Sequence, residues 1–115
     1  MDTIKTLVIE PLRRPELRDI DPSITAIGET IGGYAEPLPL DRRTTLWCDE
    51  EGAIKNLKPN RTIRLSQDSR LADAGKPIII RGTFVITGPH PQDGPLGLDD
   101  EQIGRYAAMF ADPEA

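Results

Sequence analysis

Two short arginine segments are the residues of this chain best suited to hold a ligand. The first is Arg42-Arg43, and the second supplies further polar side chains: Asn60, Arg61, Thr62 and Arg64. Arginine guanidinium groups match phosphate oxygens as a bidentate fork, while Asn and Thr side chains can hold a ribose or the edge of a base. If the two segments meet in the fold, they form a clamp for a nucleotide.

A plainer interpretation of the same arginines also stands. Short runs of charge are commonly a solvated face of the protein. Acidic side chains that could form local ion pairs with these arginines lie close by in the sequence: Asp41, Asp49, Glu50 and Glu51. The sequence alone leaves both interpretations open.

Two aromatic side chains could complete a nucleotide site. Tyr34 and Trp47 can each stack on a base, although in a chain with 4% aromatic residues such side chains are more often core or interface anchors. The Gly32-Gly33 pair resembles a phosphate cradle only weakly, because phosphate-binding glycines open a helix and this pair follows one. We expect the pair to end a helix.

The residue types needed for catalysis or metal binding are sparse. His90 is the only histidine and Cys48 the only cysteine, and they lie far apart in the sequence. Zinc sites and general-base sites usually bring several such side chains together. Cys48 ends an apolar stretch and is expected to be a small buried hydrophobe. We therefore expect no enzyme activity, no metal site and no cofactor.

The composition restricts the partners and the compartment. A net charge of -5 disfavours non-specific binding to nucleic acid and to anionic membranes, because both need a basic surface. One cysteine cannot form an intrachain disulfide. The chain shows neither a basic-then-apolar leader nor a run of about 20 apolar residues that could span a bilayer. We expect a cytoplasmic protein without a membrane partner.

Length and composition predict one small domain. The 115 residues suit a single core, and the whole range 1–115 is expected to form one domain. Hydrophobic residues make up 37% of the chain and aromatic residues 4%, so the core depends on Ile, Leu and Val. Such a monomer would be marginally stable, which favours a homo-oligomer.

Runs of β-branched and apolar residues predict the strands. Thr3–Glu10 and Glu16–Ile20 are expected to form an antiparallel hairpin. The prolines at 37 and 39 place a strand over Tyr34–Leu40 at a sheet edge. Ile78–Thr87 has the strongest strand pattern and is expected at the centre, with Gly82 marking a bulge or a close approach of another backbone. Further strands are predicted over Thr44–Cys48, Ala53–Leu57 and Arg61–Leu65.

Two amphipathic helices are predicted. Asp21-Pro22 is a strong helix start, and three isoleucines follow on one face: Ile24, Ile27 and Ile31. Asp99 with Gln102 predicts a capping box. An apolar stripe follows this second start at helical spacing: Ile103, Tyr106, Ala107 and Phe110.

The order of these elements indicates an α+β fold. We expect a small antiparallel or mixed β-sheet with two amphipathic helices packed on it. The polar segment 66–76 is predicted to be a loop, and the segment of about 88–97, rich in proline and glycine, a flexible loop. Residues 111–115 are predicted to be a frayed end.

Six short motifs, taken in order, resemble one protein family. The motifs are Ile4–Pro11, Gly32–Glu36, Cys48–Gly52, Leu57 with Pro59-Asn60-Arg61, Gly82–Val85 and Leu98–Ile103. In this order they resemble the domain of unknown function 3846 family, which is found largely in bacteriophages, plasmids and their hosts. The family carries no established activity, so the resemblance implies no catalytic residue.

The resemblance and the arginine segments together lead to one functional hypothesis. A small mobile-element protein without a catalytic constellation is expected to act by binding, and one such role is to sequester a host nucleotide immune signal. The alternative is a protein-binding module that inhibits a host defence or restriction enzyme or regulates phage functions. An exposed apolar surface without a basic pocket would favour that alternative.

Overall fold

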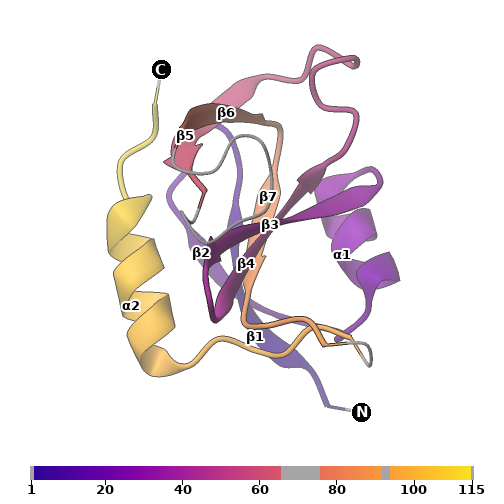
Figure 1. Cartoon of the computed structure of the whole chain (residues 1–115), viewed down its shortest axis with the longest axis vertical. Coiled ribbons are helices and arrows are strands. Elements are labelled where there is room, and N and C mark those ends of the chain that lie inside the picture. The colour runs from indigo at the N-terminus through magenta and orange to yellow at the C-terminus, as the bar shows by residue number, and fades with distance from the viewer. Residues whose placement is uncertain (1, 66–75, 92–93, 115) are drawn as a thin grey trace.

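The computed structural model describes residues 2–65, 76–91 and 94–114, and within them the chain forms seven strands and two helices. Five strands form one antiparallel sheet in the order β2-β1-β7-β4-β3, and two form a separate antiparallel pair, β5-β6 (Figure 1). The fold is α+β, as predicted. The elements are β1 (Ile4–Ile9), β2 (Glu16–Ile20), α1 (Ile24–Ile31), β3 (Ala35–Asp41), β4 (Thr44–Asp49), β5 (Pro59–Arg64), β6 (Pro77–Arg81), β7 (Phe84–Thr87) and α2 (Asp100–Met109).

The five-stranded sheet is covered on both faces. α1 packs on one face, where Ile27 and Ile31 meet Trp47 and Val85. α2 and the β5-β6 pair supply side chains to the core on the other face, and Figure 1 shows the two helices on opposite sides of the sheet. Since both faces are covered, every residue of β4 and β7 is buried.

The first helix begins later than predicted. Ser23 is its N-cap and accepts a hydrogen bond from the Ala26 amide at 3.1 Å, so Asp21-Pro22 lie before the helix. Ile24 is the first helical residue and is 57% exposed, whereas the other two isoleucines of the predicted apolar face are buried. Ser23, and not Asp21, is the N-cap because it stands directly before the first helical turn.

The Gly32-Gly33 pair ends α1, as predicted, and each glycine has its own reason. Gly32 adopts a left-handed conformation, with φ 88°, which suits a residue without a Cβ. A Cβ on Gly33 would lie 2.4 Å from Asp49 Oδ2. That carboxylate is 1% exposed and pairs with Lys55 Nζ at 2.9 Å. Gly33 therefore leaves room for a buried carboxylate.

The strand predicted over Ala53–Leu57 is wrong, because this segment forms turns. Its backbone bonds are local: the Lys55 amide donates to the Glu51 carbonyl and the Leu57 amide to the Gly52 carbonyl, each at 2.9 Å. The places beside β4 are already taken by β3 and β7. A returning strand therefore has no edge of β4 to join.

Gly82 divides the strand predicted over Ile78–Thr87 into two. β6 pairs with β5, and β7 is the middle strand of the five-stranded sheet. Gly82 lies between them with φ 79°, and its amide donates to the Lys58 carbonyl at 2.8 Å. The group that a Cβ on Gly82 would meet is the side chain of Leu57, at 2.8 Å, and not another backbone. Gly82 marks a change of sheet within one apolar run.

Three other local predictions are confirmed. β1 and β2 form the antiparallel hairpin, and β3, with its two prolines, lies at the sheet edge. Asp99 and Gln102 form the capping box of α2.

The two predicted loops have different outcomes. The loop predicted at 66–76 falls, except for residue 76, outside the described residues, and the described residues of 88–97 form neither helix nor strand. No described helix has the length and apolar character needed to cross a bilayer.

Candidate functional site

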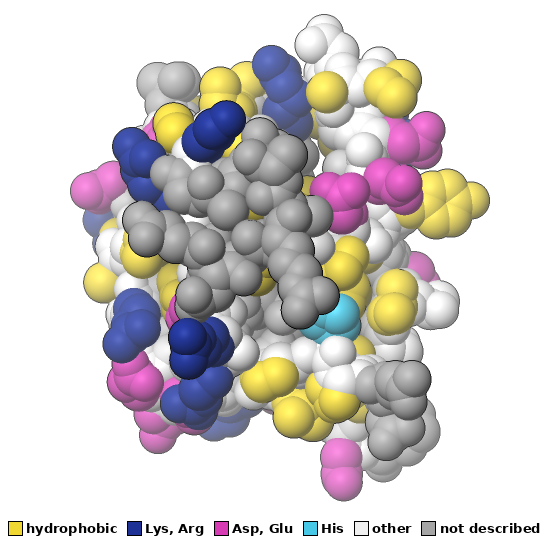
Figure 2. Space-filling view, viewed as in Figure 1, with side chains coloured by type: hydrophobic (Ala, Val, Ile, Leu, Met, Phe, Trp, Pro, Cys, Tyr) yellow, Lys and Arg dark blue, Asp and Glu magenta, His cyan; other side chains and the backbone are white. Residues whose placement is uncertain are grey.

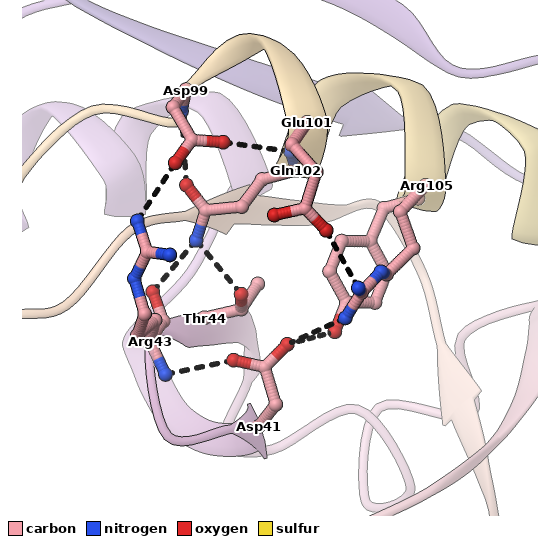
Figure 3. Close-up of polar contacts among 8 residues, drawn as sticks. Asp41, Arg43, Thr44, Asp99, Glu101, Gln102 and Arg105 are labelled. Atoms are coloured by element: carbon pink, nitrogen blue, oxygen red, sulfur yellow. Dashed lines mark hydrogen bonds and ion pairs between the residues drawn. The ribbon is translucent and has the colours of Figure 1, made fainter.

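A pocket lies where the turn between β3 and β4 meets the start of α2 (Figure 3). Its volume is about 400 Å³. Three arginines line it: Arg42 and Arg43 come from the turn, and Arg105 comes from α2. The other lining residues are Asp41, Thr44, Glu101 and Gln102. We call this hollow the arginine pocket.

The turn itself presents two of the arginines. β3 ends at Asp41 and β4 begins at Thr44, so Arg42 and Arg43 are the two residues between the strands, and both are exposed. Asp41 Oδ1 accepts a hydrogen bond from the Arg43 amide at 2.7 Å, which is the local bond by which an aspartate stabilises a turn. The β3–β4 hairpin therefore holds both arginines at the mouth of the pocket.

Gln102 fastens α2 to this turn. Its buried side-chain amide donates to the Arg43 carbonyl and to Thr44 Oγ1, each at 2.9 Å. Its amide oxygen accepts from the Asp99 amide at 2.9 Å as one half of the capping box. The helix start and the hairpin are therefore positioned by one side chain, which fixes the two walls of the pocket relative to each other.

Two of the three arginines of the pocket, Arg43 and Arg105, are held by exposed carboxylates. Arg43 donates to Asp99 at 2.7 Å, and Arg105 donates to Glu101 at 2.6 Å. Arg105 also lies 4.0 Å from Asp41. The side chains of Arg43 and Arg105 are 65% and 56% exposed, so solvent screens both pairs. The ion pairs position the guanidinium groups without burying them.

Asp41 is the anionic centre of this network. Burial acts to raise its pKa, but hydrogen bonds from the Tyr106 hydroxyl and the Arg43 amide, together with other contacts, lower the pKa below its ordinary value. Burial and the same contact with Asp41 raise the pKa of Tyr106 to about 12. Asp41 is therefore the acceptor and Tyr106 the donor at neutral pH.

Asp99 is held in its charged form as well. The hydrogen bond from the Gln102 amide is the main cause that lowers its pKa, and the contact with Arg43 acts in the same direction. The carboxylate thus caps α2 and binds an arginine of the neighbouring hairpin. This double role joins the helix start to the candidate site.

Two residues of the second arginine segment are part of the core. Arg61 and Asn60 are each 1% exposed. Arg61 donates to the carbonyls of Arg13, at 2.7 Å, and Phe110, at 2.9 Å, and to Asn60 Oδ1 at 2.8 Å. Asn60 donates in turn to the carbonyls of Ile9 and Gly82, each at 2.9 Å. Both side chains tie backbone segments together and expose almost no surface, and Arg61 contributes to the lining of a hollow beside the end of α2.

The other two residues of that segment lie on the exposed side of β5. The Thr62 amide and hydroxyl donate to the carboxylate of Glu114, at 2.9 Å and 3.2 Å. Arg64 is exposed and, like Thr62, lines a second hollow of about 400 Å³ beside the last turn of α2. Glu114 belongs to the segment predicted to be frayed, and in the structure its side chain lies against β5.

The two arginine segments do not form one clamp. Arg43 contacts Asp99 at the start of α2, whereas Arg61 contacts Phe110 at its end. A helix rises about 1.5 Å per residue, so these two ends are about 16 Å apart. Figure 2 shows two separate groups of Lys and Arg side chains on the side of the molecule where α2 lies.

The two aromatic candidates are also separated. Tyr34 is 75% exposed and lines a groove beside α1, on the other side of the sheet from α2. Trp47 is 1% exposed, and its indole Nε1 donates to Thr87 Oγ1 at 2.9 Å. A buried indole has no free face on which a base could stack. Tyr34 is excluded from the arginine pocket by its place beside α1, and Trp47 by its burial.

Five of the seven residues that line the pocket were not predicted as site residues from the sequence: Asp41, Thr44, Glu101, Gln102 and Arg105. Arg105 lies next to an apolar position of α2, and Gln102 is explained locally by the capping box, so neither pointed to the β3–β4 turn. The only signal is the spacing of Glu101 and Arg105, which is that of a helical ion pair. No short-range pattern links residue 105 to residues 42 and 43.

The described residues offer little for metal or thiol chemistry. No group of three or more His, Cys, Asp or Glu side chains among them is placed to hold a metal ion. Cys48 is buried, as predicted, and burial, with the charges of Glu36 and Asp49, raises the pKa of its thiol to about 12. Such a thiol is a poor nucleophile at neutral pH.

The comparisons with known proteins give a family and no further relative. Searches of curated proteins and of solved structures found no significant match. One sequence family, described as "Domain of unknown function (DUF3846)", matches residues 4–111, which is nearly the whole chain. The chain belongs to the DUF3846 family.

Proposed function

We propose that this protein is a non-enzymatic binding protein that holds a phosphate-bearing small molecule, such as a nucleotide, in the arginine pocket. The observation that carries the proposal is the convergence of Arg42, Arg43 and Arg105 from two elements on one hollow. Guanidinium forks bind phosphate oxygens in a bidentate manner. Three guanidinium groups around one hollow can bind several phosphate oxygens of one ligand.

A phosphate can take the place of the carboxylates that hold these arginines. Solvent screens exposed ion pairs, so releasing Glu101 or Asp99 from its arginine costs little free energy. Asp41 stays in place, because its oxygens hold the turn amide and the Tyr106 hydroxyl. The phosphate of the ligand would therefore replace Glu101 and Asp99 as partner of the arginines, while Asp41 keeps the turn in shape.

Binding without turnover is the role that the pocket residues support. Thr44 Oγ1 accepts a hydrogen bond from Gln102. The two lining carboxylates are also engaged, because Asp41 accepts from the Arg43 amide and the Tyr106 hydroxyl, and Glu101 pairs with Arg105. The proposal accordingly assigns no nucleophile and no metal to this site. A protein that binds a ligand and retains it unaltered acts as a sponge, that is, it lowers the free concentration of that ligand.

The wider biological role extends the proposal by association with the family. A phage or another mobile element would use such a protein in the cytoplasm of the host cell to sequester a nucleotide immune signal. A homo-oligomer would supply several pockets per particle. The prolines of β3 remove N–H groups from that sheet edge, so we expect subunits to meet elsewhere than by adding a strand to β3.

Native mass spectrometry tests the proposal, because it reports subunit number and bound mass together. The probes are pyrophosphate, cyclic dinucleotides and ADP-ribose. We expect a discrete adduct of unaltered mass on the natural protein and its loss in Arg42→Glu. Arg13→Glu is the matched control, since it makes the same charge change at a side chain that is 74% exposed and outside the pocket. No adduct across the panel, or conversion of a probe, would contradict the proposal.

A second candidate function, a protein-binding module, is favoured by the groove beside α1. Ile24 and Tyr34 line this groove of about 490 Å³ and are 57% and 75% exposed. Exposed apolar side chains that share one hollow are typical of protein contact surfaces. Under this candidate, a host protein, such as a defence enzyme, co-purifies with the natural chain and with Arg42→Glu but not with Tyr34→Ser. Under the nucleotide proposal, Tyr34→Ser leaves ligand binding unchanged.

A further inference from the structure

A second hollow adjoins the arginine pocket. That hollow, of about 320 Å³, shares Asp41, Arg42 and Thr44 with the arginine pocket. It reaches His90 and is lined on the way by three prolines: Pro37, Pro39 and Pro89. Three arginines line the first hollow, and proline rings and His90 line the second. We call the two adjoining hollows the groove.

His90 presents an exposed ring at the far end of this groove. The ring rests against the buried indole of Trp47, with centroids 5.0 Å apart and the planes inclined by 64°. Such edge-to-face contact leaves the histidine ring supported from one side. In Figure 2 the histidine, in cyan, is visible on the same face as the lower group of Lys and Arg side chains.

Hydrogen bonds hold the backbone directly before His90. Thr87 accepts a hydrogen bond from the Trp47 indole and donates to the Gly88 carbonyl at 2.9 Å. The Gly88 amide donates to the Leu96 carbonyl at 2.9 Å, and the Leu96 amide donates to the Pro89 carbonyl at 2.8 Å. The backbone on either side of Pro89 is therefore tied to the end of β7 and to a later part of the same loop, which positions the histidine beside the groove.

We propose that this groove takes a nucleoside phosphate, with the base against His90 and the phosphates at Arg42 and its neighbours. The inference rests on the proposed phosphate site and deepens it by assigning a site for the base of the ligand. Bases stack on aromatic rings with little regard to sequence, because every base has a π-face. Proline rings on the groove wall supply further apolar contact for the ribose and base. Trp47 acts as a positioning residue through the histidine that it supports.

Calorimetric titration separates the base from the phosphates. The probes are pyrophosphate and the four common ribonucleoside diphosphates, titrated into the natural protein, His90→Ala, His90→Phe and Arg42→Glu. We expect at least one diphosphate to bind about tenfold more tightly than pyrophosphate, which is the usual effect of one stacked base. His90→Ala should remove that gain and leave pyrophosphate binding unchanged, and His90→Phe should restore the gain. Arg42→Glu should weaken all five probes.

Other outcomes overturn the inference in distinguishable ways. If pyrophosphate binds but no nucleoside diphosphate binds more tightly, or the gain survives in His90→Ala, the base site is wrong and the phosphate site stands. If neither pyrophosphate nor any diphosphate binds the natural protein, the phosphate site fails and the base site fails with it. Thermal unfolding of His90→Ala checks that the loss of this exposed ring leaves the fold intact.

Discussion

The guanidinium of Arg43 donates a 2.7 Å hydrogen bond to Asp99, the residue that caps α2. The two residues are 56 positions apart in the sequence, and their contact joins the β3–β4 hairpin to the helix start. The capping carboxylate thereby holds one of the three arginines that line the pocket. The arginine pocket forms where the hairpin meets the helix start, and its expected affinity for anions depends on the charged side chains at this contact.

Removing a competing carboxylate should strengthen anion binding. Glu101→Gln leaves Arg105 without its 2.6 Å carboxylate partner, so a phosphate no longer has to displace a charge. Since an exposed pair is worth about 0.2–1 kcal/mol, we expect the affinity for pyrophosphate to rise by about 1.5- to 5-fold in titration calorimetry. Glu16→Gln, which releases Arg18 on β2, is the matched control and should leave the affinity unchanged. Equal gains in both variants would point to net charge and not to the pocket.

Acidification should weaken the fold through Asp41. Its pKa is lowered in the folded protein, so the carboxylate adds stability that is present above its ordinary pKa of about 3.9 and is lost as the pH falls through the folded value. We expect Asp41→Asn to lower the free energy of unfolding at pH 6 and to lose less stability than the natural protein between pH 6 and pH 3. Urea unfolding at the two pH values measures this. Asp19→Asn, exposed on β2, controls for net charge, and parallel losses in Asp41→Asn and the natural protein would contradict the assignment.

Gly33 and Gly104 should respond to alanine in opposite ways. A Cβ on Gly33 would lie 2.4 Å from a buried carboxylate oxygen, and forcing a group into a packed site costs about 1–3 kcal/mol. Gly104 lies within α2 with nothing within 4 Å of an added Cβ, so Gly104→Ala should stabilise the protein by about 0.5–1 kcal/mol. Denaturant unfolding of the two variants measures the difference. Similar effects at both positions would contradict the packing around Gly33.

Arg61 should act through stability and not through ligand contact. Arg61→Met leaves the carbonyls of Arg13 and Phe110 without their donor, and each unsatisfied buried group costs about 1–3 kcal/mol. We therefore expect a clear fall in the urea midpoint of Arg61→Met, and a small one in Arg64→Met at an exposed position of the same strand. Arg61→Glu adds an unpaired buried charge and should unfold the protein. A stable Arg61→Met that loses ligand binding would restore Arg61 to the site.

The predictions that succeeded depend on neighbouring residues. The capping box of α2 needs only Asp99 and Gln102, and the edge position of β3 follows from its prolines. The failures depend on the tertiary structure. Ala53–Leu57 cannot be a strand beside β4, because β4 already has two neighbours. Gly82 splits an apolar run that looks continuous in the sequence. An apolar pattern in the sequence indicates that a strand is buried, but it does not indicate which sheet the strand belongs to.

The candidate site shows the same division. Arg42 and Arg43 were found by residue type, and their exposure follows from the short turn between β3 and β4. Arg61 has the same chemistry but is buried among backbone carbonyls, and no local pattern distinguishes it from the exposed arginines. Arg105 joins the pocket only because α2 packs beside the turn. Residue type indicated the chemistry, and packing decided which residues share a site.

A titration with pyrophosphate followed by amide NMR shows where on the chain a phosphate-bearing probe binds. If the arginine pocket is the phosphate site, we expect saturable shifts of the amides of residues 41–44 and 101–105, with little change around residues 60–64 at the other end of α2. Loss of these shifts in Arg42→Glu, but not in Arg13→Glu, would complete the assignment. An unchanged spectrum at millimolar pyrophosphate, or shifts confined to another surface, would contradict it.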